Sequence, residues 1–504
     1  MDRRNFVIST AVGAMGLGAS NLFSTIAEAA PVLDMSQIPS KDAVWADVKE
    51  MNALGARHCG NAAHLTFMKS LEDRLAALGM AINNLDHKSL LYWEPRNIAI
   101  TAFSGEKLPV GACNRWSAVT GEAGVGGQLV YLGRCEGPSV FTLPLYPDQR
   151  SVIKIPDDIK GKIALVEVMA NKRPLDILYP KSDIAYYFDA DRHAPFPKTQ
   201  GPNCGNHSVL PVDFEKNLKK AGAIGIIYAW SNIADADAQG RHQIGTTELP
   251  SLWVVPSTGA KLKKMAEAGQ KVTLTVTAKV VPNAPTRTIV ATLPGQSEES
   301  IILWTHTDGQ NAIEENGGLA ILNMMRYFVK LPKEQRERTL HVVASEGHMA
   351  EQYVPTSAWI RERPSLCEKA VALVSIEHLG CREWLSNPAA NTYEPTGENV
   401  VAYTFCPTKA IQEAAIDAGK TQKMGRAVII NTDKHSVTPG MAAYRMAKVP
   451  VFGYISVPSY LECDSANGHI AKLSPDLFYD QMLMLTRLVR GLDATPKSVL
   501  RPAV

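Results

Sequence analysis

The chain has 504 residues, more than one hydrophobic core usually supports, so two or more domains are expected. Hydrophobic residues make up 45% of the chain and charged residues 20%, a composition that excludes wholesale disorder. With 52 basic and 50 acidic residues the formal net charge is +2, so no overall field attracts nucleic acid or an anionic membrane, and we expect a small-molecule partner.

The first 29 residues have the pattern of an export signal. Arg3 and Arg4 precede a weakly apolar, Gly/Ala-rich stretch that reaches Phe23, as in twin-arginine signal peptides. Small residues in Ala27–Ala29 suit a cleavage site, so the mature chain is expected to begin at Ala30. The alternative, an uncleaved membrane anchor, is less favoured because polar residues interrupt a stretch already short for spanning a bilayer. We therefore expect the twin-arginine export machinery as a partner, a periplasmic or secreted location, and no membrane association after cleavage.

Eight cysteines would enter a compartment that permits disulfides. Their spacing contains no CxxC pair and no zinc-finger pattern, and eight cysteines allow about 105 pairings, so the connectivity cannot be read from the sequence. We expect structural roles for them.

Residues 30–105 are expected to form an N-terminal, helical part of the catalytic domain. Between Lys41 and Gly79, apolar residues recur every three or four positions, which predicts two helices. His58 and His64 lie in this part and are expected to be structural.

Residues 106–285 differ in character, with short β-rich runs at 128–133 and 162–168 between clusters of Gly, Pro and Asn. This pattern predicts a separate β-rich module inserted into the catalytic domain. Three segments, 158–166, 217–227 and 249–269, resemble the protease-associated domain, a module that is often inserted in metallopeptidases.

In residues 286–504, strands and helices alternate, which predicts an α/β sandwich: a mostly parallel sheet covered by helices on both faces. Strands are expected at 301–305, 340–345, 371–376 and 449–455, and helices at 319–329 and 475–492.

Candidate metal ligands follow these predicted strands, at the edge where open α/β sheets bind their ligands. His306 and Asp308 follow the first strand, and Glu346 and His348 follow the second. Glu377 and His378 follow the third, and His469 follows the fourth at a distance. Four segments of chain thus deliver imidazole and carboxylate groups to one edge, which predicts a metal site.

The residue types and spacings suggest roles for the candidate side chains. On an extended backbone, Asp308 would lie on the same side as His306 and support its imidazole through the second ring nitrogen. Glu315, at the start of the next helix, would turn back and bridge two cations. Glu346 would be the general base, taking a proton from a water whose pKa is lowered to roughly 7 by a single zinc. Because neighbours on a strand face opposite ways, Glu377 is preferred to His378.

The region from about 286 to 495 resembles the co-catalytic zinc exopeptidases, the family of aminopeptidase Y, glutamate carboxypeptidase and glutaminyl cyclase. The family's His-x-Asp motif is here His306-Thr307-Asp308, and its bridging Asp-Asn motif appears as Glu315-Asn316. Its Glu-Glu pair, base then ligand, is here Glu346-Gly347-His348, so His348 would substitute for the second carboxylate. The next family Asp corresponds to Glu377, and the late His corresponds to His469, with Asp464 also possible by spacing.

The resemblance implies a metal-dependent hydrolase that cleaves peptide or related amide bonds, with a peptide or acyl-amino acid as substrate. Its cofactor would be zinc, one or two ions. The altered positions Glu315 and Gly347 also suit a binding or scaffold protein on the same fold, and a single-zinc site would suit an enzyme that processes another kind of amide. The implied metal ligands are His306, Glu315, His348, Glu377 and His469.

Overall fold

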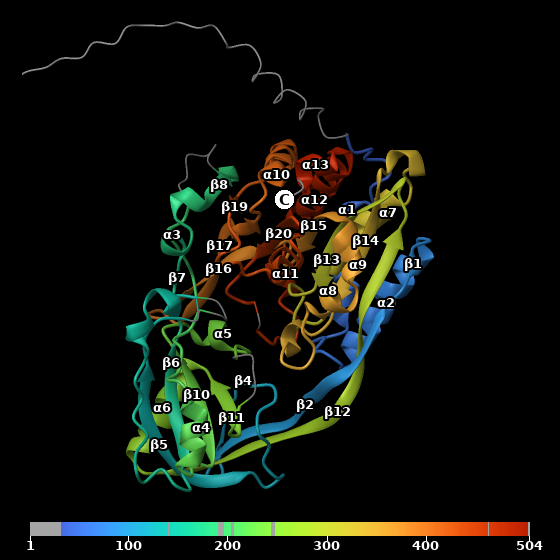
Figure 1. The fold of residues 1–504 in the computed structure, drawn as a ribbon. Coiled ribbons are helices and arrows are strands. Elements are labelled where there is room, and N and C mark those ends of the chain that lie inside the picture. The colour runs from blue at the N-terminus through green and yellow to red at the C-terminus, as the bar shows by residue number, and fades with distance from the viewer. Residues whose placement is uncertain are drawn as a thin grey trace, which may run out of the picture.

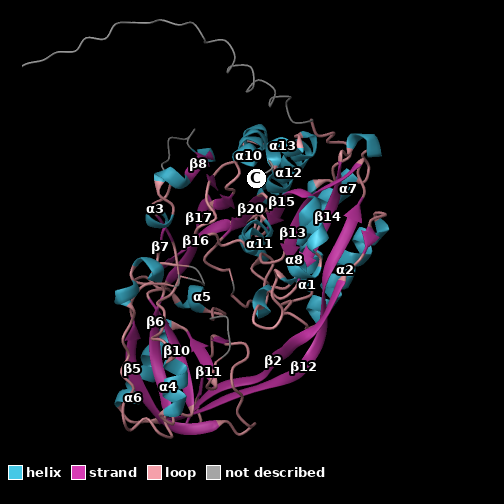
Figure 2. Ribbon diagram, viewed as in Figure 1, coloured by secondary structure: helices cyan, strands magenta, loops and turns pink. Residues whose placement is uncertain are grey.

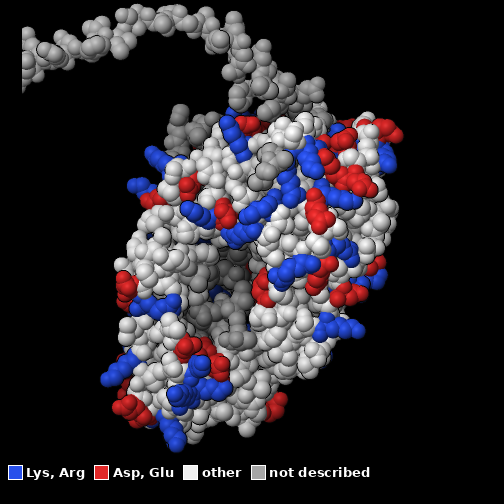
Figure 3. Space-filling model, viewed as in Figure 1, with Lys and Arg blue, Asp and Glu red and all other residues white. Residues whose placement is uncertain are grey.

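The computed structural model describes residues 32–139, 141–189, 196–202, 206–242, 247–461 and 463–501. The predicted signal peptide, residues 1–29, and Cys204 lie outside the described residues. The described chain forms a large lobe and a small lobe, which a long two-stranded ribbon connects (Figure 1). Figure 3 shows a hollow on the face of the molecule between the two lobes.

The large lobe is built on a mostly parallel sheet, in the order β12-β14-β13-β15-β20-β18-β19-β8. The neighbouring strands β14, β13, β15 and β20 all run parallel, so their carboxyl ends meet at one edge. Antiparallel strands stand at both sides of this group. The strands are β8 (Ile184–Tyr187), β12 (Lys271–Leu293), β13 (Ser297–His306), β14 (Arg338–Ser345), β15 (Ala370–Ile376), β18 (Ala402–Phe405), β19 (Ala427–Ile430) and β20 (Val451–Ser456).

Side chains of the central strand β13 alternate between two hydrophobic cores. Ile301 and Leu303 belong to one core, and Ile302 and Trp304 belong to the other, as expected when successive residues face opposite sides of a strand. A strand buried on both faces needs helices on both faces. The first core packs against α1 (Lys41–Ala53), α2 (Ala62–Ala77), α7 (Gly317–Phe328), α10 (Lys409–Thr421) and α12 (Pro475–Ala494), and the second against α8 (Ala358–Glu362), α9 (Pro364–Lys369) and α11 (Ala442–Ala447).

Several helices begin where the local sequence favours a helix start. Ser40 caps α1 by accepting a hydrogen bond from the Ala43 backbone N–H, and Asn61 caps α2 in the same way. Ser474 caps α12, which has Pro475 in its first turn. The two predicted N-terminal helices and the predicted helices near 319–329 and 475–492 are thus present.

The small lobe contains a second, mainly parallel sheet in the order β4-β11-β10-β6-β5, with β4 antiparallel at its edge. Helix α6 covers one face and α4 the other, each contributing to a separate hydrophobic core. These elements are β4 (Ala112–Cys113), β5 (Val125–Cys135), β6 (Ile163–Met169), α4 (Phe214–Lys220), β10 (Gly225–Ser231), β11 (Ser251–Val254) and α6 (Pro256–Glu267).

The ribbon consists of β2 (Leu85–Ala102) and β12, which pair antiparallel along nearly the whole length of β2 (Figure 2). It carries the chain from the large lobe into the small lobe and back. The segment between its strands also returns to the large sheet, because β8 pairs with β19. The shorter elements are β1 (Ala81–Ile82), β3 (Lys107–Leu108), β7 (Arg173–Pro174), α3 (Leu175–Leu178), β9 (Thr199–Gln200), α5 (Asp235–Ala238), β16 (Arg382–Asn387), β17 (Thr392–Asn399) and α13 (Lys497–Leu500).

Two further features concern the described residues only. The seven cysteines among them are buried and free of disulfides. In the same part of the chain, every helix is too short or too polar to cross a bilayer.

Candidate metal centre

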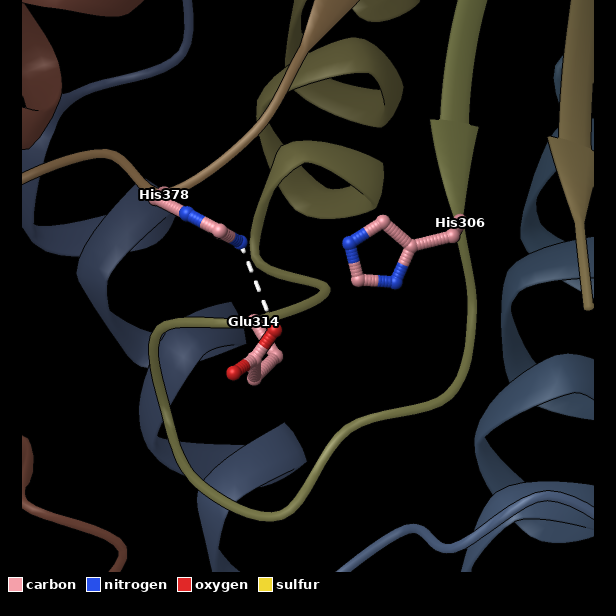
Figure 4. A group of neighbouring side chains, drawn as sticks. All are labelled: His306, Glu314 and His378. Atoms are coloured by element: carbon pink, nitrogen blue, oxygen red, sulfur yellow. Dashed lines mark ion pairs between the residues drawn. The ribbon is translucent and has the colours of Figure 1, made fainter. Parts of the chain in front are cut away.

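Three buried side chains from separate segments converge at the carboxyl edge of the large sheet. His306 ends β13, Glu314 lies in the loop before α7, and His378 follows β15. One potential ligand atom from each lies within 4.8 Å of those from the other two, and Figure 4 shows them pointing toward one another. Among the described residues, this is the one group of at least three His, Cys, Asp or Glu side chains with that closeness. We call it the His306 cluster.

Both imidazoles of the cluster are oriented by backbone carbonyl groups. Nδ1 of His306 donates to the carbonyl oxygen of Asp308 at 3.0 Å, and Nδ1 of His378 donates to that of Ser456 at 2.7 Å. A neutral imidazole with its proton on Nδ1 presents a lone pair on Nε2. Neither Nε2 atom has a hydrogen-bond partner, although both are buried. This is the arrangement by which proteins hold metal-ligating histidines.

Burial also keeps His306 neutral. Burial, and then the neighbouring His348 and His378, lower the pKa of His306 well below its ordinary value. A neutral ring is the form that binds a metal.

Glu377 adds a second carboxylate to the cluster. Its Oε1 accepts hydrogen bonds from Ser375 at 3.0 Å and Thr438 at 2.5 Å, whereas its buried Oε2 has no hydrogen-bond partner. That Oε2 lies 3.7 Å from Nε2 of His306. Burial raises the pKa of Glu377 to about 7, although His378 and the hydrogen bonds from Thr438 and Ser375 act in the opposite direction.

Glu377 and His378 both face the cluster, although they are neighbours in sequence. An extended strand would have placed them on opposite sides. The backbone leaves the strand at His378, which has a φ of 58° in the left-handed region. Nε2 of His378 consequently lies 3.4 Å from Oε2 of Glu314 (Figure 4). The expected choice between these two residues does not arise, since both reach the site.

The donor atoms of the His306 cluster fit a zinc ion. Two imidazole Nε2 atoms and one carboxylate form the His₂Glu set found in catalytic zinc sites, which leave a fourth position open. The buried Nε2 atoms and Oε2 of Glu377, which lack hydrogen bonds, are the groups that a bound cation would satisfy.

Zinc affinity is expected to rise with pH up to about pH 7. Burial favours the neutral form of His378, but the Glu314 carboxylate outweighs it and raises the pKa of His378. Zinc must displace the proton of His378, and its charge also disfavours the proton on the nearby Glu377, whose pKa is about 7, so protons and zinc compete. Affinity should increase by up to about tenfold per pH unit for each proton released. Competition with a chromophoric chelator between pH 5.5 and 8 measures it; a flat profile would contradict the linkage, and Glu377→Gln should give a shallower slope.

Asp308 connects two loops of the site. Its carboxylate accepts hydrogen bonds from the backbone N–H groups of His348 at 3.0 Å and Met349 at 2.8 Å. Its carbonyl oxygen, rather than the expected carboxylate, supports His306. The ring of His348 lies against that of His306, with the centroids 4.2 Å apart and the planes tilted by 41°. His348 therefore lies beside the cluster as a neighbour of His306, but outside the three-residue group.

Glu315, the expected ligand from the loop before α7, is not one of the three residues of the cluster. It forms a buried ion pair with Arg57, which comes from the segment between α1 and α2. The carboxylate in the cluster is that of the preceding residue, Glu314. Helix α7 approaches the end of β15 closely because Gly317 has no side chain. A Cβ at Gly317 would overlap the carbonyl group of Ile376.

Glu346, the expected general base, is fully engaged elsewhere. His87 forms an ion pair with its Oε1, and Thr288 donates to its Oε2 at 2.7 Å. Both partners belong to the ribbon strands β2 and β12. The hydrogen bond to Glu346 raises the pKa of His87 to about 9, so this imidazole is protonated at neutral pH.

His469 and Asp464 lie on the loop after β20, which contacts the loop that carries Glu314. The backbone N–H of Ala312 donates to the carbonyl of Gly468 at 2.8 Å. The ring of His469 lies against Tyr460, and the Asp464 carboxylate lies 3.5 Å from Nε2 of His58 and 3.6 Å from Nε2 of His242. The structure thus groups Asp464 with side chains from two other segments rather than with the His306 cluster.

Gly347 shows why the second carboxylate of the family's Glu-Glu pair has no counterpart here. Its φ is 88°, and a Cβ would overlap the carbonyl group of Val354. Replacing Gly347 by Glu is therefore expected to destabilise the protein by roughly 1–3 kcal/mol and to leave the zinc content per chain unchanged. Gly397→Glu is the matched control, because Gly397 has a φ of 86° and open space around it. Thermal unfolding and metal analysis measure both effects, and an additional zinc ion in Gly347→Glu would refute this expectation.

Comparison with known proteins gives structural matches only. No protein-family model matches the chain, and no curated protein matches its sequence. The zinc aminopeptidase BSAP from Bacillus subtilis matches with a TM-score of 0.61 at 13% identity, over 92% of this chain and 98% of that one. A peptidase M28 precursor from Shewanella amazonensis matches with a TM-score of 0.60 at 14% identity, over 92% and 100%. An aminopeptidase from Aneurinibacillus sp. strain AM-1 matches with a TM-score of 0.54 at 13% identity, over 90% and 94%.

These matches cover almost the whole length of each chain. The protein has the fold of the zinc aminopeptidases, and the predicted mostly parallel sheet with flanking helices is confirmed.

Proposed function

We propose that this protein is a zinc-dependent hydrolase of peptide or related amide bonds. The observation that supports the proposal most strongly is the His306 cluster: two buried imidazoles with bare Nε2 atoms and the Glu314 carboxylate, at the carboxyl edge of the sheet. The zinc aminopeptidase fold of the chain supports the same reaction class.

His306, Glu314 and His378 would hold the ion. Zinc would supply Lewis acidity, which polarises the carbonyl group to be cleaved and acidifies water. The protein contributes a dry, preorganised setting, because all three side chains are buried and both histidines are fixed through Nδ1.

Glu377 is the carboxylate best placed to move a proton in this reaction. Its Oε1 is fixed by Ser375 and Thr438, while Oε2 faces the cluster without a hydrogen-bond partner. It would accept a proton from the attacking water and deliver it to the leaving amine. Glu346, the base expected from sequence, would have to break its contacts with His87 and Thr288 to take that role. We therefore propose that Glu346 has a structural role and holds the neighbouring loop in place.

Export by the twin-arginine pathway and a protease-associated identity for the inserted module belong to the same proposal. The export signal is supported by the arginine pair and the cleavage pattern in residues 1–29. The module is supported by the three sequence segments that resemble the protease-associated domain.

Metal removal and two carboxylate variants test the proposed reaction. Dialysis against a chelator should abolish hydrolysis of aminoacyl and acyl-amino-acid substrates, and added zinc should restore it. Glu377→Gln should keep its zinc and lose roughly 10²–10⁴-fold in kcat, the usual contribution of a general base. Glu394→Gln, on the exposed part of β17, serves as control. Full activity of the metal-free protein would reject the function, and full activity of Glu377→Gln would reject the base.

A second candidate is a single-zinc enzyme that acts on an amide other than a peptide bond. It is favoured by the finding of one ligand group among the described residues and by the steric exclusion of a side chain at Gly347. Turnover of acyl-amide substrates in the absence of any dipeptide hydrolysis would select it.

A further inference from the structure

Among the described residues six arginines are buried, and the charge of Arg115 is compensated differently from that of the other five. Arg57, Arg241, Arg338 and Arg490 form ion pairs with carboxylates. Arg173 lies over the rings of Phe141, Tyr179 and Tyr403. Among the described residues, Arg115 forms neither kind of contact. Buried charges are rarely left without a partner, so this guanidinium requires an explanation.

Only one nitrogen of Arg115 is hydrogen-bonded. Nη2 donates to Nδ1 of His58 and to Oε1 of Gln310 at 2.7 Å. Arg115 is only 6% exposed. Nevertheless, the solvent-inaccessible side-chain atoms of the described residues that lack a hydrogen bond do not include its Nε or Nη1. These two donors therefore reach solvent from an otherwise buried position. Nε and Nη1 lie on different sides of the guanidinium from each other, and each can offer a single charge-assisted hydrogen bond to an anion.

Arg115 lies close to the candidate metal centre, although it follows β4 of the small lobe. Gln310, which fixes it, belongs to the same loop as Asp308 and Glu314. Burial lowers the pKa of Arg115, while Asp464, Asp308 and Glu314 are near enough to act on its charge through space. The small lobe thus places a fixed cation beside the His306 cluster.

We propose that Arg115 binds a carboxylate of the substrate, so that the preferred substrates are short peptides or acyl-amino acids with a free carboxylate next to the cleaved bond. This proposal rests on the proposed function, because it names the substrate class of that site. The neutral neighbour His58 fits the role: burial and Arg115 lower its pKa well below the ordinary value, so His58 orients the guanidinium without adding charge. An incoming carboxylate would complete the ion pair that the fold leaves open.

Binding of matched ligands tests the proposal independently of turnover. The probes are N-acetyl-L-leucine and N-acetyl-L-leucinamide, measured by isothermal titration calorimetry on the full protein. The wild-type protein should bind the acid at least roughly tenfold more tightly than the amide, and Arg115→Gln should remove this preference by weakening the acid alone. Arg115→Lys should retain part of the preference, because lysine keeps the charge but not the fixed, planar set of donors. Arg96→Gln, an exposed residue of β2, is the charge-matched control.

A metal-free variant separates this inference from the proposed function. A carboxylate can also bind zinc, so the titrations are repeated on Glu314→Gln, where the acid-over-amide preference should persist if Arg115 carries it. Equal binding of acid and amide by the wild-type protein, or an unchanged preference in Arg115→Gln, would overturn the role of Arg115. Absence of zinc-dependent hydrolysis with the preference intact would instead overturn only the proposed reaction. For any variant with a lowered melting temperature, titration below its unfolding transition keeps the comparison valid.

Discussion

Glu314→Gln is expected to lose its zinc and on the order of 1000-fold in hydrolytic activity, whereas Glu315→Gln is expected to keep its zinc. Glutamine preserves the shape of the side chain but removes the anionic ligand, and a catalytic zinc contributes several kcal/mol to lowering the barrier. Glu314 lies in the His306 cluster, while Glu315 is bound to Arg57. Two adjacent residues of the same type are thus predicted to have separate functions, one in catalysis and one in stability.

Metal analysis after gel filtration, together with zinc-dependent changes in melting temperature, distinguishes the two variants. Zinc should raise the melting temperature of Glu315→Gln, as it does for a protein that binds it in the folded state only. It should leave Glu314→Gln unchanged. A zinc-free Glu315→Gln protein that is demonstrably folded, or a zinc-replete Glu314→Gln protein, would return the ligand role to Glu315.

Arg57→Met is expected to cost about 3–5 kcal/mol of unfolding free energy, the usual cost of removing one partner from a buried ion pair. Arg57 is 1% exposed, and besides Glu315 it donates to the carbonyl oxygens of Met51, Gly55 and Asn311. Its removal therefore leaves the Glu315 carboxylate buried without a cation and several carbonyl groups without a donor. The double variant Arg57→Met/Glu315→Leu should recover part of the loss, since it removes the stranded charge as well.

Urea denaturation followed by circular dichroism measures these free energies. The control is Lys69→Met, which breaks an exposed pair with Asp73 on α2 and should cost less than about 1 kcal/mol. Equal losses of unfolding free energy for Arg57→Met and Lys69→Met would show that the buried ion pair stabilises the protein no more than the exposed one. A double variant less stable than Arg57→Met would contradict the stranded-charge explanation.

The sequence predicts the scaffold of this protein well, because the scaffold depends on local patterns. Continuous apolar runs, each followed by His, Asp or Glu residues, identify β13, β14 and β15. Apolar residues that recur every three or four positions identify α2, α7 and α12. His306 is likewise predictable, since a histidine directly after a buried parallel strand lies at the edge where ligands bind. These inferences require no knowledge of distant contacts.

The members of the His306 cluster that the sequence does not identify depend on such distant contacts. Spacing alone does not separate Glu314 from Glu315; the deciding partner is Arg57, which lies in another part of the chain. The one signal in the sequence is an arginine near the N-terminus, which would need a carboxylate partner if it were buried. Strand alternation favours Glu377 over His378, and the positive φ of His378 that breaks this alternation is a property of the fold. The bonds that occupy Glu346 likewise come from the distant His87 and Thr288.

Because β2 leads away from the large lobe and β12 returns beside it, everything between these strands is topologically the loop of a single hairpin. Loop-closure entropy grows only with the logarithm of loop length, so an appendage of almost any size is tolerated at such a point. The three residues of the His306 cluster lie wholly outside that loop, and Arg115 lies within it. Changes of length or sequence in the loop can therefore alter the residue proposed to recognise the substrate while leaving the backbone that holds the His306 cluster in place.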